Sequence, residues 1–303
     1  MNICITGSSG FAGRNIVSYF EKLKLNLKLL TRHELQTITS SKLEDCDVVI
    51  HLAGKAHDLK KVSYPKDYYD VNYELTKKLY DSFLHSNAKK FIFVSSVKAA
   101  ADSVEGVLTE NMIPDPKTDY GKSKLMAEQY IQSQQLPDDK SYYILRPCMI
   151  HGPGNKGNLN LLYNFVKKGI PYPLAGFDNL RSFLSIENLC FIISQLIEKN
   201  NIASGIYQVA DDKPLSTNDV IKILSASLNK KPKLWSLSPG LIRFIAKIGN
   251  TLYLPLTTER LDKLTESYVV SNSKIKQAIA KELPLTADDG LKFTALSFSS
   301  DKS

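Results

Sequence analysis

The chain has 303 residues, of which 43% are hydrophobic, so its length and composition are those of an ordinary folded protein with a sizeable core. The formal net charge is +8, but the basic residues are dispersed and no nucleic-acid-binding motif is present, so nucleic acid is not an expected partner. A solvated basic surface accounts for this charge, and a weak attraction for anionic substrates or a membrane face is the alternative. No run of about 18 apolar residues occurs, so we expect no membrane span.

The cysteines and the N-terminus indicate the cellular setting. Cys4, Cys46, Cys148 and Cys190 are scattered, without C-x-x-C spacing. This pattern predicts free thiols in a reducing compartment and no metal site. The first residues lack a basic segment before an apolar run, so we expect a cytoplasmic protein rather than a secreted one.

Strand-like and helix-like runs alternate through the first half of the chain, which is typical of a parallel sheet with crossover helices. A helix is expected near residues 11–24, directly after the first strand. The expected strands are short apolar runs at residues 2–5, 25–30, 47–54, 89–96, 141–147 and 204–211.

A glycine-rich turn separates the first expected strand from the first expected helix. In the stretch TGSSGFAG, Gly7, Gly10 and Gly13 have the spacing G-x-x-G-x-x-G. Such glycines let backbone N–H groups approach a pyrophosphate, which then lies at the positive end of the helix. A tight turn that binds nothing is the alternative, but the strand before and the helix after favour a dinucleotide site.

The sequence therefore predicts an α/β protein with a Rossmann doubly wound parallel sheet and a smaller, mostly C-terminal α+β substrate lobe. We expect the dinucleotide-binding domain to span residues 1–152 and 182–210. The substrate-binding lobe is then formed by residues 153–181 and 211–303.

A tyrosine and a lysine, Tyr120 and Lys124, lie four residues apart in the stretch TDYGKSK. On a helix, their side chains would share a face. The same spacing recurs at Tyr73/Lys77 and at Tyr163/Lys167, so the spacing alone identifies no site.

The order of several motifs resembles that of the extended short-chain dehydrogenase/reductases, the nucleotide-sugar epimerase/dehydratase family. The resemblance covers residue 2 to about residue 275. It rests on TGSSGFAG, VVIHLAG, Asn72, FVSS, the Tyr120/Lys124 pair and LRPCMIHGPG. The family order selects Tyr120 and Lys124 among the three pairs, because they follow FVSS at the right interval.

The resemblance implies a catalytic set of Ser96, Tyr120 and Lys124. The ammonium of Lys124 is expected to lower the pKa of the Tyr120 phenol, which could then exchange a proton with a sugar hydroxyl near neutral pH. Ser96 would hold the same oxygen by a hydrogen bond. Ser95 is the competing candidate, but strand alternation points it the other way.

The resemblance also implies which residues contact the dinucleotide. They are Gly7, Ser9, Gly10, Phe11, Gly13, Thr31, Arg32, Leu52, Ala53, Gly54, Asn72, Tyr120 and Lys124. At the end of the second strand, Thr31 and Arg32 stand where NAD-preferring domains carry an acidic residue, and Glu34 lies one turn later. NADP(H) is therefore favoured, and NAD(H) is the alternative.

Substrate contacts are implied at Ser96, Lys98, Asn158, Arg181 and Arg260. Arginines suit a sugar-linked diphosphate, because the guanidinium can donate two parallel hydrogen bonds. For Lys98, a solvated side chain is the alternative. Val97 and Lys98 occupy places where the sugar 4,6-dehydratases carry an Asp-Glu pair, so dehydration is disfavoured.

Together these features predict NAD(P)-dependent reduction of a 4-keto UDP-sugar, for example a 4-keto-6-deoxy-N-acetylhexosamine, for cell-surface polysaccharide precursors. A UDP-sugar 4-epimerase that retains tightly bound NAD is the alternative. A non-catalytic dinucleotide sensor is disfavoured, because the chain keeps both Tyr120 and Lys124. A homodimer, common in the family, stays open.

Overall fold

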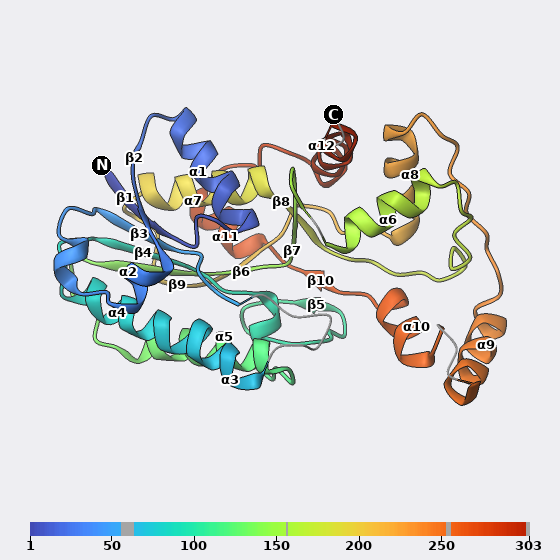
Figure 1. Cartoon of the computed structure of the whole chain (residues 1–303), viewed down its shortest axis with the longest axis horizontal. Helices are drawn as coiled ribbons and strands as arrows, with labels where there is room; N and C mark the ends of the chain where they lie inside the picture. The colour runs from blue at the N-terminus through green and yellow to red at the C-terminus, as the bar shows by residue number, and fades with distance from the viewer. Residues whose placement is uncertain (56–63, 156, 253–255, 301–303) are drawn as a thin grey trace.

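A computed structural model describes residues 1–55, 64–155, 157–252 and 256–300. Its centre is a six-stranded sheet with the strand order β2-β1-β3-β4-β6-β9 (Figure 1). Every neighbouring pair in this sheet is parallel. The strands are β1 (Asn2–Thr6), β2 (Asn26–Leu30), β3 (Val48–His51), β4 (Lys90–Val94), β6 (Ser141–Pro147) and β9 (Gly205–Val209). All six strands expected from the sequence are confirmed.

Both faces of the sheet are covered, as a parallel sheet with crossover helices requires. Side chains alternate along β1, so Ile3 and Ile5 enter one core cluster while Cys4 enters the other. The first cluster includes residues of α1 (Phe11–Lys22), α7 (Ile186–Glu198) and α11 (Ser273–Ile279). The second includes residues of α2 (Arg32–Gln36), η1 (Ser40–Leu43), α4 (Leu75–Leu84) and α5 (Asp119–Ser133).

Short elements follow the carboxyl ends of the strands. After β3 come α3 (Pro65–Tyr68) and the π-helical turn η2 (Tyr69–Glu74), and η3 (Val97–Ala99) follows β4. Two small parallel pairs lie outside the main sheet. They join β5 (Val107–Leu108) to β10 (Val269–Val270), and β7 (Met149–His151) to β8 (Phe183–Ser185).

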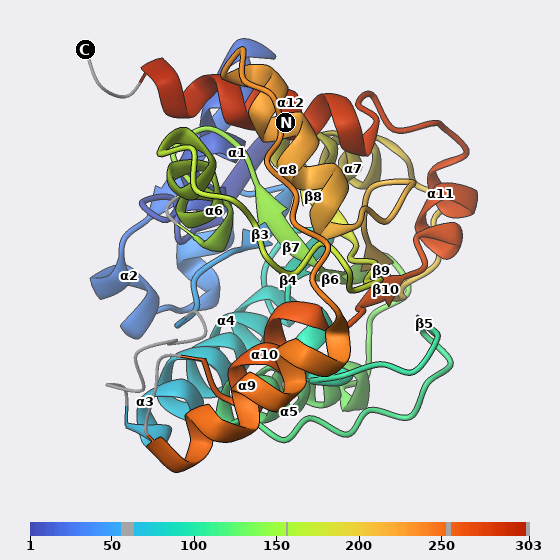
Figure 2. The same ribbon diagram turned by 90° about the vertical axis from the view of Figure 1, so that its right-hand side faces the viewer.

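Beyond the sheet, two further core clusters hold a helical region. One joins α6 (Asn158–Lys167), α8 (Thr217–Ser227) and α12 (Ala287–Ser300). The other joins α9 (Pro239–Leu252), α10 (Thr258–Thr265) and the segment before β8. Figure 2 shows α9 and α10 below α6 and α8 on the face turned to the viewer.

Helix α11 packs against the sheet, although the expected domain boundaries place it in the substrate-binding lobe. Ile275 and Ile279 of α11 are fully buried in the cluster formed with α7 and the sheet. This helix therefore packs with the dinucleotide-binding layer, although it lies within residues 211–303. In the described part of the chain, no helix is long and apolar enough to cross a membrane.

Candidate active site

The turn after β1 requires glycine at two of its three positions. Gly7 has φ +74°, and a Cβ there would lie 2.5 Å from the backbone nitrogen of Ala53. A Cβ on Gly13 would lie 2.2 Å from the carbonyl oxygen of Gly7. Gly10 has an ordinary φ, and its nearest contact would be 3.4 Å away. Gly7 thus lets the turn approach the loop after β3, and Gly13 lets α1 approach the turn.

A cavity of about 790 Å³ lies at the carboxyl ends of β1, β2 and β3. Its lining includes eight of the expected cofactor positions, namely Gly7, Ser9, Gly10, Thr31, Arg32, Leu52, Ala53 and Gly54. Gly13 supports the turn from behind, and Phe11 packs against the core cluster of α7. The crevice at the carboxyl ends of the strands is where doubly wound sheets bind dinucleotides.

A second cavity, of about 240 Å³, adjoins the first, because Leu52, Gly54 and Lys55 line both. The candidate catalytic residues Ser96, Tyr120 and Lys124 also line this cavity. The rest of its wall is formed by Val94, Ser95, Pro147, Cys148 and Ile150. The structure therefore brings the predicted catalytic set together beside the predicted dinucleotide cavity.

The start of α5 explains how Tyr120 reaches Ser96. The hydroxyl of Thr118 caps the helix by accepting a hydrogen bond from the backbone of Gly121 at 3.2 Å. A Cβ on Gly121 would lie 2.4 Å from the carbonyl oxygen of Lys98, so only glycine lets the helix pack this closely on η3. The side chain of Ser96 lies beside the phenol of Tyr120 in the wall of the same cavity.

The pKa of Tyr120 differs from the expectation. Burial raises it, the hydrogen bond with Ser96 lowers it, and the nearby Tyr68 raises it again, with a net increase. The rings of Tyr68 and Tyr120 meet edge to face, 6.2 Å apart. Among the protein's own residues, it is therefore Ser96 and not Lys124 that lowers the pKa of Tyr120 against the effect of burial.

Lys124 lies in a buried position one helical turn beyond Tyr120. Its Nζ donates to the carbonyl oxygen of Val94 at 3.1 Å and lies 4.7 Å from the ring centroid of Phe93. Burial lowers the pKa of Lys124 to about 8, and the carboxylate of Glu128 acts in the opposite direction. This ammonium is therefore poised to lose its proton only slightly above neutral pH.

A buried ion pair lies beneath Lys124. Glu128, one turn further along α5, binds Nη2 of Arg146 through Oε2 at 2.5 Å, and both side chains are almost fully buried. The hydroxyl of Ser95 donates to Oε1 of the same carboxylate. Ser95 is thus held by the ion pair, while Ser96 pairs with Tyr120.

Asn72 lies in the π-helical turn, a rare geometry that often occurs at functional sites. It is fully buried, and its amide binds both backbone groups of Lys55, at 2.7 and 3.1 Å. The same amide nitrogen donates to the hydroxyl of Ser123, whose own proton goes to the carbonyl of Tyr120. Asn72 therefore ties the loop after β3 to the start of α5.

A second buried network supports the same loop through His51. Thr76 gives its hydroxyl proton to the carbonyl of Asn72, so it can only accept from Nε2 of His51, at 2.8 Å. Nδ1 of His51 then accepts from Thr6, which in turn accepts from the backbone of Ala53. The imidazole is neutral, because burial and the charge of Lys124 lower its pKa to about 3.

The expected substrate residues lie in different surroundings. Nζ of Lys98 donates to the carbonyl of Asp102 at 2.7 Å and lies over the ring of Tyr268, so it is not a freely solvated lysine. Arg181 donates to the carbonyls of Lys263 and Glu266 at the end of α10. Arg181 and the exposed Asn158 both line a third cavity, whereas Arg260 lies exposed on α10.

This third cavity has a volume of about 570 Å³ and a mainly apolar wall. It lies among α6, α8, α9 and α10. Its apolar lining includes Leu159, Leu162, Phe165, Leu174, Phe183 and Val220.

Some residues of the site were missed by sequence reasoning. Glu128 could have been found from its place four residues after Lys124, and Arg146 from its charge within an apolar strand. Tyr68 and His51 carried no comparable signal. The tyrosines of the other two Tyr/Lys pairs pack in the core: Tyr163 is buried in the cluster of α6, and Tyr73 packs against the cluster of α4 and α5. In the described residues, no group of His, Cys, Asp or Glu could hold a metal ion.

Comparison with known proteins identifies the family. Residues 3–210 match the family model "NAD dependent epimerase/dehydratase family". The chain belongs to this family, and it is an enzyme.

Three relatives align with most of the chain. A UDP-glucose 4-epimerase of Vibrio cholerae is 31% identical over 98% of this chain and 95% of its own length. The N-acetyl-alpha-D-glucosaminyl-diphospho-ditrans,octacis-undecaprenol 4-epimerase of Escherichia coli O157:H7 is 28% identical over 92% and 86%. A GDP-6-deoxy-D-mannose reductase of Pseudomonas aeruginosa is 24% identical over 73% and 78%.

Solved structures confirm the fold. The UDP-glucuronic acid 4-epimerase of Bacillus cereus in complex with NAD has a TM-score of 0.74 at 20% identity, with complete coverage of both chains. RMD of Pseudomonas aeruginosa, complexed with NADPH, has a TM-score of 0.73 at 19% identity over 99% of each chain.

Proposed function

We propose that this enzyme inverts the C4 hydroxyl of a diphosphate-linked hexose by way of a 4-keto sugar. The observation that carries the proposal is that Ser96, Tyr120 and Lys124 line one cavity that adjoins the dinucleotide cavity. Two relatives that align with more than 90% of the chain are 4-epimerases, which supports reaction at this carbon.

The turn around Gly7 and Gly13 fits a nicotinamide dinucleotide, because these glycines let the turn pack closely on the loop after β3 and on α1, so that the N-terminus of α1 borders the cavity where a pyrophosphate would lie. When bound, the dinucleotide supplies hydride transfer at the sugar carbon. Tyr120 exchanges the proton of the 4-hydroxyl, and Ser96 holds the same oxygen. The cation of Lys124 favours the phenolate form of Tyr120 at this step.

Elimination of water is not part of this proposal. The dehydratase acid and base positions are Val97 and Lys98 here, and Lys98 is engaged by the carbonyl of Asp102. Without a carboxylate at either position, the chain lacks the acid and base at the places where dehydration needs them.

Reduction of a 4-keto sugar by NADPH is the second candidate. Arg32 lines the cavity at the end of β2, where an arginine suits the 2′-phosphate of NADP. The carboxylate of Glu34 is occupied by hydrogen bonds from the backbone and hydroxyl of Thr31, at 2.8 and 2.7 Å. A GDP-sugar reductase among the relatives also supports this candidate.

The group beyond the diphosphate can be a nucleoside or a polyprenol. A UDP-sugar follows from the first relative, and a polyprenyl-linked sugar from the second. The apolar third cavity favours the second substrate class, because a hydrocarbon chain gains free energy by leaving water.

Two measurements decide between the candidates. The purified enzyme is denatured, and the released dinucleotide is identified. A separate native sample is given UDP-glucose, UDP-N-acetylglucosamine, polyprenyl-diphosphate-linked N-acetylglucosamine and the C4 epimers of all three without added cofactor. A further native sample is given a 4-keto nucleotide sugar with NADPH. Conversion between epimers with retained NAD supports the epimerase. Stoichiometric NADPH consumption supports the reductase, and no turnover in any arm overturns both.

A further inference from the structure

One segment of the chain is basic because it contains no acidic residue. Residues 220–258 contain six basic residues and no acidic one, in a chain whose formal net charge is +8. The same segment holds the only tryptophan, Trp235, which is 57% exposed. Neither the dinucleotide cavity nor the catalytic set uses this charge.

Helix α9, within this segment, carries two apolar stripes. Ile242, Ala246 and Gly249 are buried, and the first two pack in the core cluster shared with α10. The second stripe is exposed and has the spacing i, i+3, i+4, i+7 of one helix face. Its members are Leu241, Phe244, Ile245 and Ile248. Because the helix already buries one stripe, the exposed stripe is not needed to anchor α9 to the fold.

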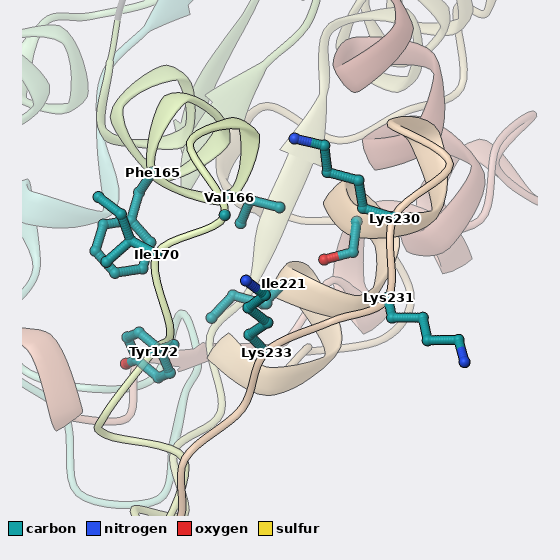
Figure 3. Close-up of a pocket in the computed structure, with 10 residues that line it drawn as sticks. Phe165, Val166, Ile170, Tyr172, Ile221, Lys230, Lys231 and Lys233 are labelled. Carbon is teal, nitrogen blue, oxygen red and sulfur yellow. The ribbon is translucent and has the colours of Figure 1, made fainter.

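The extended segment before α9 continues the exposed surface. The backbone of Tyr172 pairs with Lys233 and Trp235 at 2.8 Å, which holds the segment against the loop after α6. Figure 3 shows Lys230 and Lys233 at the edge of a small cavity and Lys231 directed away from it. Figure 2 shows this segment running from α8 to α9 across the front of the molecule.

We call this surface the α9 face. It consists of Lys230, Lys231, Lys233, Trp235, Leu237, Leu241, Phe244, Ile245, Lys247 and Ile248. It combines exposed aromatic and aliphatic side chains with flanking lysines. Helices that lie in the headgroup region of a bilayer show this combination, because the apolar stripe enters the acyl boundary while the cations meet anionic lipid.

We propose that the α9 face docks the enzyme on an anionic phospholipid bilayer. A second copy of this chain is a poorer occupant. A twofold interface would place this surface against itself, and the segment offers no carboxylate to pair with its lysines. A bilayer of anionic lipid supplies both the apolar phase and the negative charge. An exposed tryptophan at the edge of the stripe suits the headgroup level.

The single tryptophan gives a direct test with the whole enzyme. Trp235 emission is recorded while vesicles are added, either of phosphatidylcholine alone or of an equal mixture with phosphatidylglycerol. We expect a blue shift and co-sedimentation with the anionic vesicles, weakened by salt because exposed charges are screened. No shift and no sedimentation with the anionic vesicles would overturn the proposal. Equal binding to both vesicles would overturn its electrostatic part.

Matched variants separate docking from folding. Phe244→Glu with Ile248→Glu should weaken vesicle binding at least about tenfold, and Lys231→Glu with Lys247→Glu should do so for anionic vesicles alone. The control is Ile113→Glu, at a position 87% exposed outside the α9 face, which should bind like the parent. Light scattering measures the oligomeric state of the parent and of Phe244→Glu. If the parent is a dimer and this variant is a monomer, the α9 face binds a second copy of the chain and the proposal is overturned.

These variants lie outside the dinucleotide and catalytic cavities. Turnover of a water-soluble nucleotide sugar should therefore be unchanged in them. Loss of docking with turnover intact supports the proposal, and it holds whichever sugar reaction the enzyme performs. Docking that survives all the substitutions overturns it.

Discussion

The guanidinium of Arg146 binds the carboxylate of Glu128 through two nitrogens beneath Lys124, and both side chains are almost fully buried. Removing one partner of such a pair leaves an uncompensated charge in the core. Arg146→Met should therefore lower the free energy of unfolding by about 3–5 kcal/mol. Denaturation in urea measures this loss.

An exposed ion pair provides the control for that experiment. Lys263 and Glu259 on α10 are 2.6 Å apart, one turn from each other, and both are largely exposed. Glu259→Gln should cost less than about 0.5 kcal/mol, because solvent screens the pair. In the double variant Arg146→Met with Glu128→Leu, most of the lost stability should return. A cost for Arg146→Met as small as that of the surface variant would contradict the assigned role.

The pH dependence of turnover should report on Lys124. Burial lowers its pKa to about 8, so the side chain is a cation below that pH and becomes neutral above it. We expect the alkaline limb of kcat/KM to include this group. Because Glu128 raises the pKa of Lys124, Glu128→Gln should move that limb to lower pH. An alkaline limb that stays in place would show that Lys124 does not set it.

The catalytic role of Tyr120 can be tested with Tyr73 as the control, because Tyr73 also lies four residues before a lysine. Tyr120→Phe should reduce kcat about a hundredfold or more, since the proton of the sugar hydroxyl loses its exchange partner. Dinucleotide binding should be largely retained. Tyr73→Phe, in the pair Tyr73/Lys77, should leave kcat close to that of the parent. Full turnover in Tyr120→Phe would refute its catalytic role.

The sequence predicted the parallel sheet because each strand is a short apolar run whose alternate residues enter two cores, as Ile3 and Cys4 do. Local pattern was enough for the sheet, because strand alternation is a property of adjacent residues. The pairing of Ser96 with Tyr120 was implied instead by the family resemblance, and the structure places both residues in the wall of one cavity.

The features that sequence reasoning missed depend on contacts between distant segments. His51 joins Thr6 to Thr76, and only the packed fold shows that its imidazole is neutral. The pKa of Tyr120 was expected to fall through Lys124, but burial outweighs the favourable hydrogen bond from Ser96. Burial of a single side chain is set by the whole fold, and no four-residue spacing contains that information.

The glycine turn offers a prediction with an internal control. Gly13→Ala places a methyl group 2.2 Å from the carbonyl oxygen of Gly7, so backbone must move. We expect a loss of about 1–3 kcal/mol in stability and weaker dinucleotide binding. At Gly10 the nearest contact is 3.4 Å, so Gly10→Ala should fold with a thermal midpoint close to that of the parent. The two thermal midpoints, measured side by side, test the assignment, and equal losses would contradict it.

His51 should make the enzyme less stable in mild acid. Its pKa is lowered to about 3 in the folded chain by burial and by the charge of Lys124, against 6.5 for a free imidazole. Between these values the unfolded chain binds the proton and the folded chain does not, so stability falls as pH falls through this window. At a pH of about 5 the loss from this group is about 2 kcal/mol.

The measurement is the free energy of unfolding near neutral pH and near pH 5. His51→Asn removes the titrating group, so the fall in stability between the two values should shrink even if the variant is less stable at neutral pH. The exposed His85 serves as the control, because His85→Asn should leave the fall unchanged. If the parent and His51→Asn lose the same stability in acid, another group is responsible. The neutral imidazole of His51, between Thr6 and Thr76, would then not account for the lower stability in acid.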